Sequence, residues 1–257
     1  MSDGTAGRFD GRVAMVTGAG AGIGRATVIR LAADGAAVVV NDVREDLAAD
    51  TVAVVTAAGG RAVLAPGDVT VGADVDAIVA RAHDAVGPVD MLVNNVGGAP
   101  AGVAWRELRE TSIEDFYAFV ALNLGSAFIC SRAVVGGMVE RGYGKIVCVN
   151  SISAVFGQRA GVGYASAKAG LSGFVGSLAK EVATAGVNVN AVLIGNAPHP
   201  SRTPEREAVL NQWNHFGRHG RHEEFAGTIA FLVSEDATYL SGSTVVVDGG
   251  TLRFALL

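Results

Sequence analysis

Tyr164 and Lys168, in the segment YASAK, are the residues of this 257-residue sequence whose types and spacing best suit acid–base chemistry. Four residues of helix turn the chain by about 400°, so both side chains leave the same face one turn apart. An ammonium close to a phenol favours the phenolate, and we expect Lys168 to lower the pKa of Tyr164. Such a pair also occurs on solvated helix faces, so its context must decide whether it performs chemistry.

A glycine-rich loop, TGAGAGIG, occupies residues 17–24 and lies between an apolar run and a helical pattern. This is the context of a dinucleotide-binding turn, in which helix N-terminal amides meet a pyrophosphate. The common G-x-G-x-x-G spacing fails, because no glycine stands at position 23 or 25. The spacing T-G-x-x-x-G-x-G fits instead, on Gly18, Gly22 and Gly24. Loops also use glycine simply for positive φ, so a second signal is needed.

Asp42 supplies that second signal, because it ends the next apolar run eighteen residues after the last loop glycine. A carboxylate at this place can accept hydrogen bonds from both ribose hydroxyls. It would repel a 2′-phosphate, and Ala19 and Ala21 offer no basic side chain in compensation. Arg25 and Arg44 are nearby cations, so NADP stays an alternative, but the pattern favours NAD.

The elements that must position these residues alternate along the whole chain. Short β-branched runs predict strands at 12–17, 36–41, 61–65, 89–93, 145–149, 187–193 and 245–247. Helical patterns cover 23–34, 45–58, 73–86, 112–141 and 163–185, with another from 223. Apolar strands returned by helices indicate a parallel sheet covered on both faces. A barrel would need an eighth unit, so we expect an α/β fold: one Rossmann-type domain over 1–257, a doubly wound parallel sheet of about seven strands.

Residues 196–222 interrupt this alternation, with three of the six prolines and four of the five histidines, and we expect a lid segment there. Its cationic residues are His199, Arg202, Arg206, His215, Arg218, His219, Arg221 and His222. They could capture a carboxylate or another anionic group of a substrate, although a solvated helix is the reading that we favour. Gly217 and Gly220 interrupt the helix that would bring two histidines onto one metal, so we expect no metal site.

In combination, these motifs resemble the short-chain dehydrogenase/reductase family over nearly all of residues 11–250. The resemblance rests on the glycine loop, on NNVG at 94–97, on the tyrosine–lysine pair and on VDGG at 247–250. It implies reversible hydride transfer between a secondary alcohol and C4 of a nicotinamide. In the oxidation direction Tyr164 would accept the hydroxyl proton, and in reduction it would return that proton.

The resemblance also implies roles for individual residues. Ser151, thirteen residues before the tyrosine, would be the catalytic serine that stabilises charge on the substrate oxygen, with Ser153 as the neighbouring alternative. Asn123 would anchor a water that relays protons to the lysine, or else is a packing residue. Asn94 would tie central strands together. The implied cofactor-binding residues are Gly18, Gly22, Ile23, Gly24, Asp42, Asp68, Val69, Asn95, Gly97, Tyr164 and Lys168.

The chain departs from the family's pattern after the sixth expected strand. Ile194 stands where a proline usually precedes Gly195, and His199 stands where a threonine is usual. Both family residues shape the surroundings of the nicotinamide, so this turn is where the match is weakest. Val96 also replaces the more usual alanine.

Composition and charge limit the function classes. A net charge of −5 without a basic run argues against nucleic acid as a partner. The sequence has neither a secretory signal nor about 18 uninterrupted apolar residues, so we expect no membrane partner. Cys130 and Cys148 cannot form a disulfide framework and fit a reducing compartment, so we expect a cytoplasmic protein. By resemblance, the small-residue helices near 118–132 and 165–186 imply a homotetramer or homodimer.

The substrate class stays open at this point. We expect a small-molecule alcohol or ketone, with cyclic alcohols, diols and hydroxy acids in first place, and 3-oxoacyl (acyl-carrier) ketoreductase or steroid dehydrogenase as alternatives. A non-catalytic dinucleotide sensor would tend to lose the tyrosine and the lysine. An epimerase or dehydratase of this fold would carry a longer C-terminal substrate domain than the seven residues after Gly250.

Overall fold

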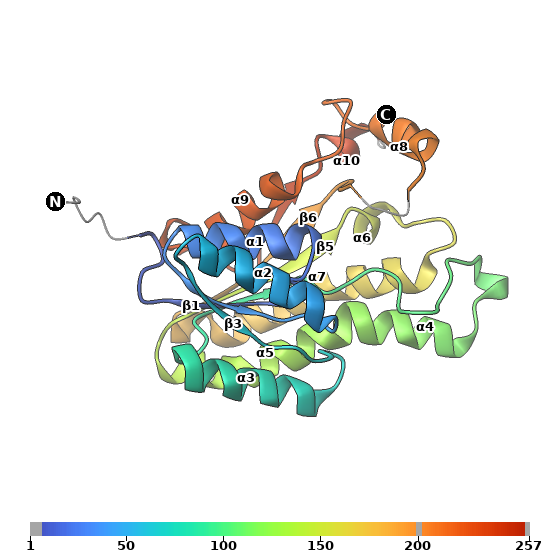
Figure 1. Cartoon of the computed structure of the whole chain (residues 1–257). Coiled ribbons are helices and arrows are strands. Elements are labelled where there is room, and N and C mark those ends of the chain that lie inside the picture. Colours follow the sequence, from blue (N-terminus) through green and yellow to red (C-terminus); the bar gives the residue numbers. More distant parts are fainter. Residues whose placement is uncertain (1–6, 199–201, 255–257) are drawn as a thin grey trace.

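A seven-stranded parallel sheet forms the centre of the protein (Figure 1). The structure, a computed structural model, describes residues 7–198 and 202–254. The strand order is β3-β2-β1-β4-β5-β6-β7. The strands are β1 (Val13–Val16), β2 (Ala37–Val40), β3 (Arg61–Leu64), β4 (Met91–Asn94), β5 (Gly144–Ser151), β6 (Val187–Ile194) and β7 (Thr244–Val247). The doubly wound α/β fold predicted from the alternation of runs is therefore confirmed.

Helices cover both faces of the sheet, which explains why its central strands are apolar throughout (Figure 1). One layer consists of α1 (Gly22–Ala33), α2 (Glu45–Ala57) and α9 (His222–Leu232), and the other of α3 (Gly72–Val86), α5 (Ser126–Glu140) and α7 (Val162–Val182). Successive strand residues point to opposite faces, so Met15 packs in one core and Val16 in the other. Both side chains are fully buried.

The order of the strands decides where a ligand can bind. The winding reverses between β1 and β4, which are hydrogen-bonded neighbours. In an open α/β sheet a crevice forms outside the carboxyl ends of the strands at such a reversal. The glycine loop follows β1, Asp42 follows β2, and Ser151 ends β5. The motifs of the sequence therefore meet at one edge of the sheet.

Two expected segments differ from the structure. The helix expected at 112–141 consists of α4 (Ile113–Val120), a π-helical turn at Ala121–Gly125 and α5. The expected lid segment contains a helix, α8 (Pro204–Asn211), which Thr203 caps and Pro204 begins. His199 lies outside the described residues. The remaining short elements are η1 (Leu108–Glu110), α6 (Ser153–Phe156), η3 (Ala183–Ala185), η4 (Glu235–Ala237) and α10 (Thr251–Phe254).

By length and composition alone, one helical stretch in the described part of the chain could cross a membrane. It is Ile113–Glu140, which is 28 residues long and contains an 18-residue window with a mean hydropathy of 1.7. A core helix of a globular α/β protein passes the same test, so the finding is weak evidence. Here the stretch packs against α7, β4 and β5, and we treat it as part of this fold.

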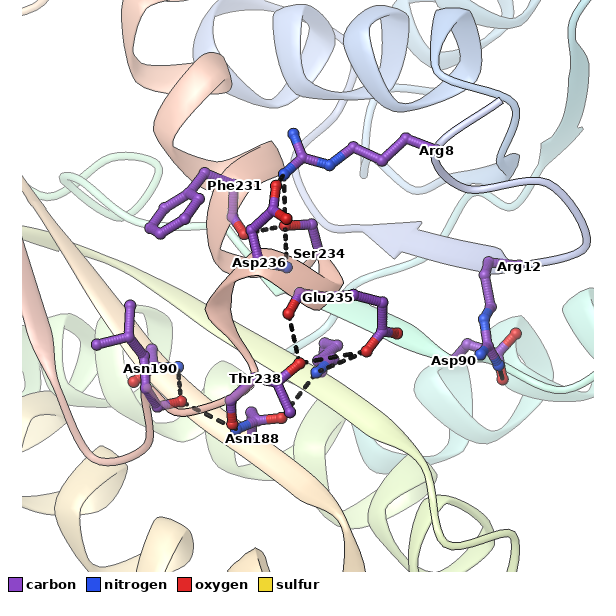
Figure 2. Close-up of polar contacts among 12 residues, drawn as sticks. Arg8, Arg12, Asp90, Asn188, Asn190, Phe231, Ser234, Glu235, Asp236 and Thr238 are labelled. Atoms are coloured by element: carbon purple, nitrogen blue, oxygen red, sulfur yellow. Dashed lines mark hydrogen bonds and ion pairs between the residues drawn. The ribbon is translucent and has the colours of Figure 1, made fainter. Parts of the chain in front are cut away.

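A polar network at the amino ends of the strands holds the connection from α9 to β7 (Figure 2). Nδ2 of Asn188 donates to the carbonyls of Thr238 (2.8 Å) and Leu240 (3.0 Å), while Oδ1 of Asn188 accepts from Lys145 Nζ (2.8 Å). Arg8, near the N-terminus of the chain, donates a hydrogen bond from Nη2 to Ser234 Oγ (2.7 Å). This network lies at the edge of the sheet opposite Ser151, so it supports the fold rather than the site.

Candidate active site

The glycine loop forms a cradle of bare backbone at the N-terminus of α1. Gly18 and Gly22 have φ values of +60° and +57°, a region that L side chains rarely adopt. Gly24 is excluded from bearing a side chain for another reason: a Cβ there would lie 2.3 Å from the Gly18 carbonyl oxygen. Backbone amides at a helix N-terminus favour an anion. The loop therefore fits the pyrophosphate of a dinucleotide.

Asp42 and Asn95 hold this loop from the two neighbouring strands. Asp42 Oδ2 accepts from the Gly20 amide at 3.0 Å, and Oδ1 accepts from the Arg44 amide at 3.0 Å. Asn95 Nδ2 donates to the carbonyls of Thr17 (2.9 Å) and Gly18 (3.1 Å). Asp42 is thus an anchored carboxylate next to the cradle, as a ribose-binding acid must be. Gly20 also belongs to the cradle, although the spacing T-G-x-x-x-G-x-G does not include it: a Cβ there would lie 2.8 Å from Asp42 Oδ2.

Other residues expected at the cofactor have structural contacts in the described chain. Asp68 Oδ1 accepts from the amide (2.8 Å) and the hydroxyl (2.7 Å) of Thr70, which closes the turn after β3. Val69 is buried in one of the two cores, and Ile23 is half-buried against the other. Asn94 donates to Ser131 Oγ at 3.1 Å and so ties β4 to α5, as expected.

Three catalytic candidates converge at the carboxyl edge of the sheet. Ser151 is the last residue of β5, and Tyr164 and Lys168 lie in the first turns of α7. The Ser151 side chain hydrogen-bonds Tyr164. Lys168 Nζ donates to the Val149 carbonyl at 2.8 Å and lies 5.9 Å from the centre of the tyrosine ring. The spacing of the motif therefore brings the expected groups together.

Burial reverses the expected electrostatics of the pair. Desolvation raises the pKa of Tyr164 above its ordinary value, while the hydrogen bond with Ser151 and the charge of Arg202 act against it. Burial also lowers the pKa of Lys168 from 10.5 to about 8. The expectation that the lysine ammonium lowers the pKa of the tyrosine is wrong, because the ammonium faces the Val149 carbonyl and is itself desolvated.

The lowered pKa of Lys168 predicts a cost in stability. Between pH 8 and 10.5 the unfolded chain binds more protons at Lys168 than the folded chain does. The contribution of Lys168 to the free energy of unfolding therefore rises with pH over this range. We expect Lys168→Met to raise the free energy of unfolding at pH 7 by about 1–3 kcal/mol, net of one lost hydrogen bond. The gain should shrink from pH 8 to 10.5. Urea denaturation across this range measures it, with exposed Lys180→Met as control. A pH-independent difference would contradict the assignment.

Asn123 belongs to the same cluster through the π-helical turn. Its Nδ2 donates to the carbonyls of Gly98 (2.9 Å) and Phe119 (3.0 Å), and its Oδ1 accepts from the Gly98 amide (2.8 Å). A Cβ on Gly97 would lie 2.8 Å from Asn123 Oδ1 and 2.9 Å from Lys168 Nζ. The asparagine, the lysine and the loop after β4 therefore meet at one point. π-Turns of this kind are frequent at functional sites.

The two candidate serines are distinguished by their partners. Ser151 hydrogen-bonds Tyr164, and its Oγ accepts from the Ser153 amide at 3.2 Å. Ser153 Oγ instead donates to Gln158 Oε1 at 3.2 Å. The contacts favour Ser151 as the residue that faces a substrate oxygen.

Trp105 also contacts Tyr164, although it belongs to none of the motifs of the sequence. Its ring lies edge-on to Tyr164, with centroids 5.4 Å apart, and 5.1 Å from Phe119. An ion pair between Glu107 and Arg159 (2.9 Å) joins the loop that carries Trp105 to the loop after β5. Trp105 is 43% exposed, so its ring adds apolar surface next to Tyr164. The signal that could have found it is that it is the sole aromatic residue in 99–110.

The turn where the family's proline is absent forms without it. β6 continues through Ile194, which pairs with Ser151 on one side and Val247 on the other. Gly195 then makes the turn, because a Cβ there would lie 2.7 Å from the Asp248 Cα. The Gly195 amide donates to the Val247 carbonyl at 3.0 Å. Ile194 therefore lengthens the strand and leaves the turn to the glycine.

These features define a dinucleotide-binding α/β protein with a serine–tyrosine–lysine site. Comparisons with known proteins agree: residues 18–251 match a family model described as enoyl-(acyl carrier protein) reductase. The chain is 39% identical to a 3-oxoacyl-acyl-carrier-protein reductase of Synechocystis over 95% of this chain and 98% of the relative. It is 39% identical to the short-chain reductase protein NovJ of Streptomyces niveus, over 93% of each.

A solved structure from Agrobacterium tumefaciens, assigned as a gluconate dehydrogenase, superposes with a TM-score of 0.90. It is 31% identical, and the match covers 95% of this chain and 97% of that one. The chain belongs to the short-chain dehydrogenase/reductase family and is an oxidoreductase of that family. Membership implies a nicotinamide dinucleotide cofactor, which the glycine cradle fits.

Proposed function

We propose that this protein is an NAD(H)-dependent oxidoreductase that interconverts a secondary alcohol and a ketone. The observation that carries the proposal is the hydrogen bond between Ser151 and Tyr164, next to Lys168 and on the same edge as the glycine cradle. When bound, the nicotinamide supplies the hydride chemistry at C4. We place cyclic alcohols, diols and hydroxy acids first among substrates.

In this proposal the protein supplies geometry, a proton and charge stabilisation. Ser151 holds the substrate oxygen and donates to it as negative charge develops. Tyr164 accepts the hydroxyl proton in oxidation and returns it in reduction. Lys168 lies behind the tyrosine, and Asn123 joins the lysine to the loop after β4 as part of a proton relay.

A titration with NADH and NADPH in parallel, followed by nicotinamide fluorescence, tests the cofactor site first. Tighter binding of NADH supports the proposal, and NADH consumption with a panel of ketones then tests the reaction. Binding of neither cofactor would overturn it. A non-catalytic dinucleotide sensor would bind NADH and reduce none of the ketones.

The choice of NAD over NADP depends on Asp42. We expect Asp42→Ala to weaken NADH binding relative to NADPH by about 10- to 100-fold, as loss of a charge-assisted hydrogen bond does. Because Asp42 also accepts from Gly20, both cofactors should bind less tightly, so the ratio is the informative quantity. Fluorescence titration measures that ratio, with exposed Asp46→Ala as the matched control. An unchanged ratio would mean that Asp42 does not contact the ribose.

A second candidate is a 3-oxoacyl (acyl-carrier) ketoreductase, and the names of two curated relatives favour it. Besides the Synechocystis protein, an Escherichia coli 3-oxoacyl-acyl-carrier-protein reductase is 35% identical over 94% of this chain. The same reaction on a β-ketoacyl thioester needs no change in the serine, tyrosine or lysine. Comparing acetoacetyl-CoA with cyclic ketones as substrates for NADH consumption distinguishes the two candidates.

Assembly and location complete the proposal. We propose a homodimer or homotetramer through the helices rich in small residues, α5 and α7, a surface to which exposed Phe128 adds apolar area. Light scattering would give a multiple of the chain's 26.1 kDa.

A cytoplasmic location is supported by Cys130 and Cys148, which are buried and free. Their pKa values are raised to about 12 and about 11 by burial, which suits inert thiols.

A further inference from the structure

The chain that leaves β6 begins beside the catalytic serine. Ile194 pairs with Ser151 in the sheet, and its carbonyl accepts from the Ile152 amide at 3.0 Å. The residues that follow Ile194 therefore lie at the mouth of the site. Ala197 stands three residues further on and is half-buried.

Arg202 returns to this point from the expected lid segment. Its Nη1 donates to the Ala197 carbonyl at 2.7 Å, and the side chain is 29% exposed. A guanidinium carries five N–H donors in a planar fork, so a single bond to a carbonyl leaves it able to take a bidentate partner. The hydrogen bond to Ala197 thus holds the guanidinium in place and leaves other N–H donors for a ligand.

The nearby carboxylate competes weakly for this cation. Glu207 Oε1 lies 3.9 Å from Arg202 Nη1, too far for a hydrogen bond. The other oxygen of Glu207, Oε2, contacts His219 Nε2 instead. The glutamate, which lies on α8, is thus directed toward the histidine, and Arg202, which precedes that helix, keeps its hydrogen bond to Ala197.

The charge of Arg202 also acts against the rise in the pKa of Tyr164, in agreement with the place that its bond to Ala197 gives it. Trp105 covers that tyrosine with an aromatic ring. The tyrosine hydroxyl therefore has an apolar wall and a cation within its surroundings. A neutral apolar substrate would remove water from this cation without offering it a charged partner, and burying an unpaired charge is costly.

We propose that Arg202 is a specificity-determining residue that binds the carboxylate of the substrate, so that this enzyme acts on hydroxy acids and the corresponding keto acids. The inference rests on the proposed function and narrows its substrate class. The carboxylate contacts the guanidinium, the apolar body packs toward Trp105, and the carbinol carbon faces Tyr164. A charge-assisted bidentate contact of this kind gives both affinity and orientation.

The test uses two ketones that share one ring and differ in the charge of its substituent: 4-oxocyclohexanecarboxylate and its uncharged ethyl ester. Wild-type enzyme with NADH should reduce the acid with the higher kcat/KM. Arg202→Gln should lower kcat/KM for the acid by about 10- to 100-fold, chiefly through KM, as the loss of one charge-assisted contact does. The value for the ester should change by less than about threefold. Arg206→Gln, an exposed arginine on α8, is the matched control and should behave as wild type.

Where the ketones react, two results would overturn the inference: a wild-type preference for the ester, or an equal loss for acid and ester in Arg202→Gln. If neither ketone reacts, calorimetric titration of the acid into the enzyme–NADH complex decides. Binding that Arg202→Gln abolishes supports the inference, and no binding overturns it. NADH affinity, measured separately on each variant, shows whether the proposed function itself has failed, because Arg202 is not assigned to the cofactor.

Discussion

Tyr164→Phe is expected to lower kcat by about 10²–10⁴-fold, the usual contribution of a general acid–base group. The substitution keeps the ring that packs on Trp105 and removes the hydroxyl that bonds Ser151. NADH affinity and thermal stability should therefore change little. Initial rates of NADH consumption and a fluorescence titration measure the two effects on the same preparation.

The matched control for this variant is Tyr239→Phe, because Tyr239 is fully exposed and lies between η4 and β7, in the connection at the amino ends of the strands. It should retain wild-type turnover. Near-normal turnover in Tyr164→Phe would overturn the catalytic assignment of the tyrosine. Loss of NADH binding in that variant would show instead that the tyrosine hydroxyl also contributes to holding the cofactor.

Gly24→Ala is expected to weaken NADH binding by about 10- to 100-fold, or about 1.4–2.8 kcal/mol. A Cβ at this position would lie 2.3 Å from the Gly18 oxygen and 2.7 Å from Asn95 Nδ2, and the first of these atoms is backbone. The loop must shift to relieve the overlap, and the amides that face the pyrophosphate shift with it. Overpacking should also cost about 1–3 kcal/mol of stability, measured by urea denaturation.

Gly72→Ala is the control for this substitution. Gly72 is the first residue of α3, is exposed, and would place a Cβ in open space. It should keep both cofactor affinity and stability. Wild-type NADH affinity in Gly24→Ala would contradict the view that close packing of the loop against its own carbonyl shapes the cofactor site.

The predicted strands agree with the structure to within about two residues at each end, because burial on both faces demands continuous apolar runs. Val13–Val16 and Ala37–Val40 are examples, because both are short apolar runs and both form strands whose residues are all buried. The helix limits agree to within about three residues, but the helix expected at 112–141 is interrupted, because contacts beyond the helix decide where a turn widens. Asn123 donates to the Phe119 carbonyl and to Gly98, and a π-turn results where a regular helix was expected.

Within the site, the sequence by itself determined that Tyr164 and Lys168 lie on one helix face, because this follows from local spacing. The strand order, which brings Ser151 and the glycine loop to the same edge, is a property of the tertiary structure. Only the tertiary structure decided their electrostatics. Desolvation depends on everything packed around a group, so it raises the pKa of the tyrosine and lowers that of the lysine against the simple pairwise expectation. The tertiary structure alone also decided that Trp105 contacts the Tyr164 ring and that the charge of Arg202 acts on its hydroxyl, because both residues are distant from Tyr164 in the sequence.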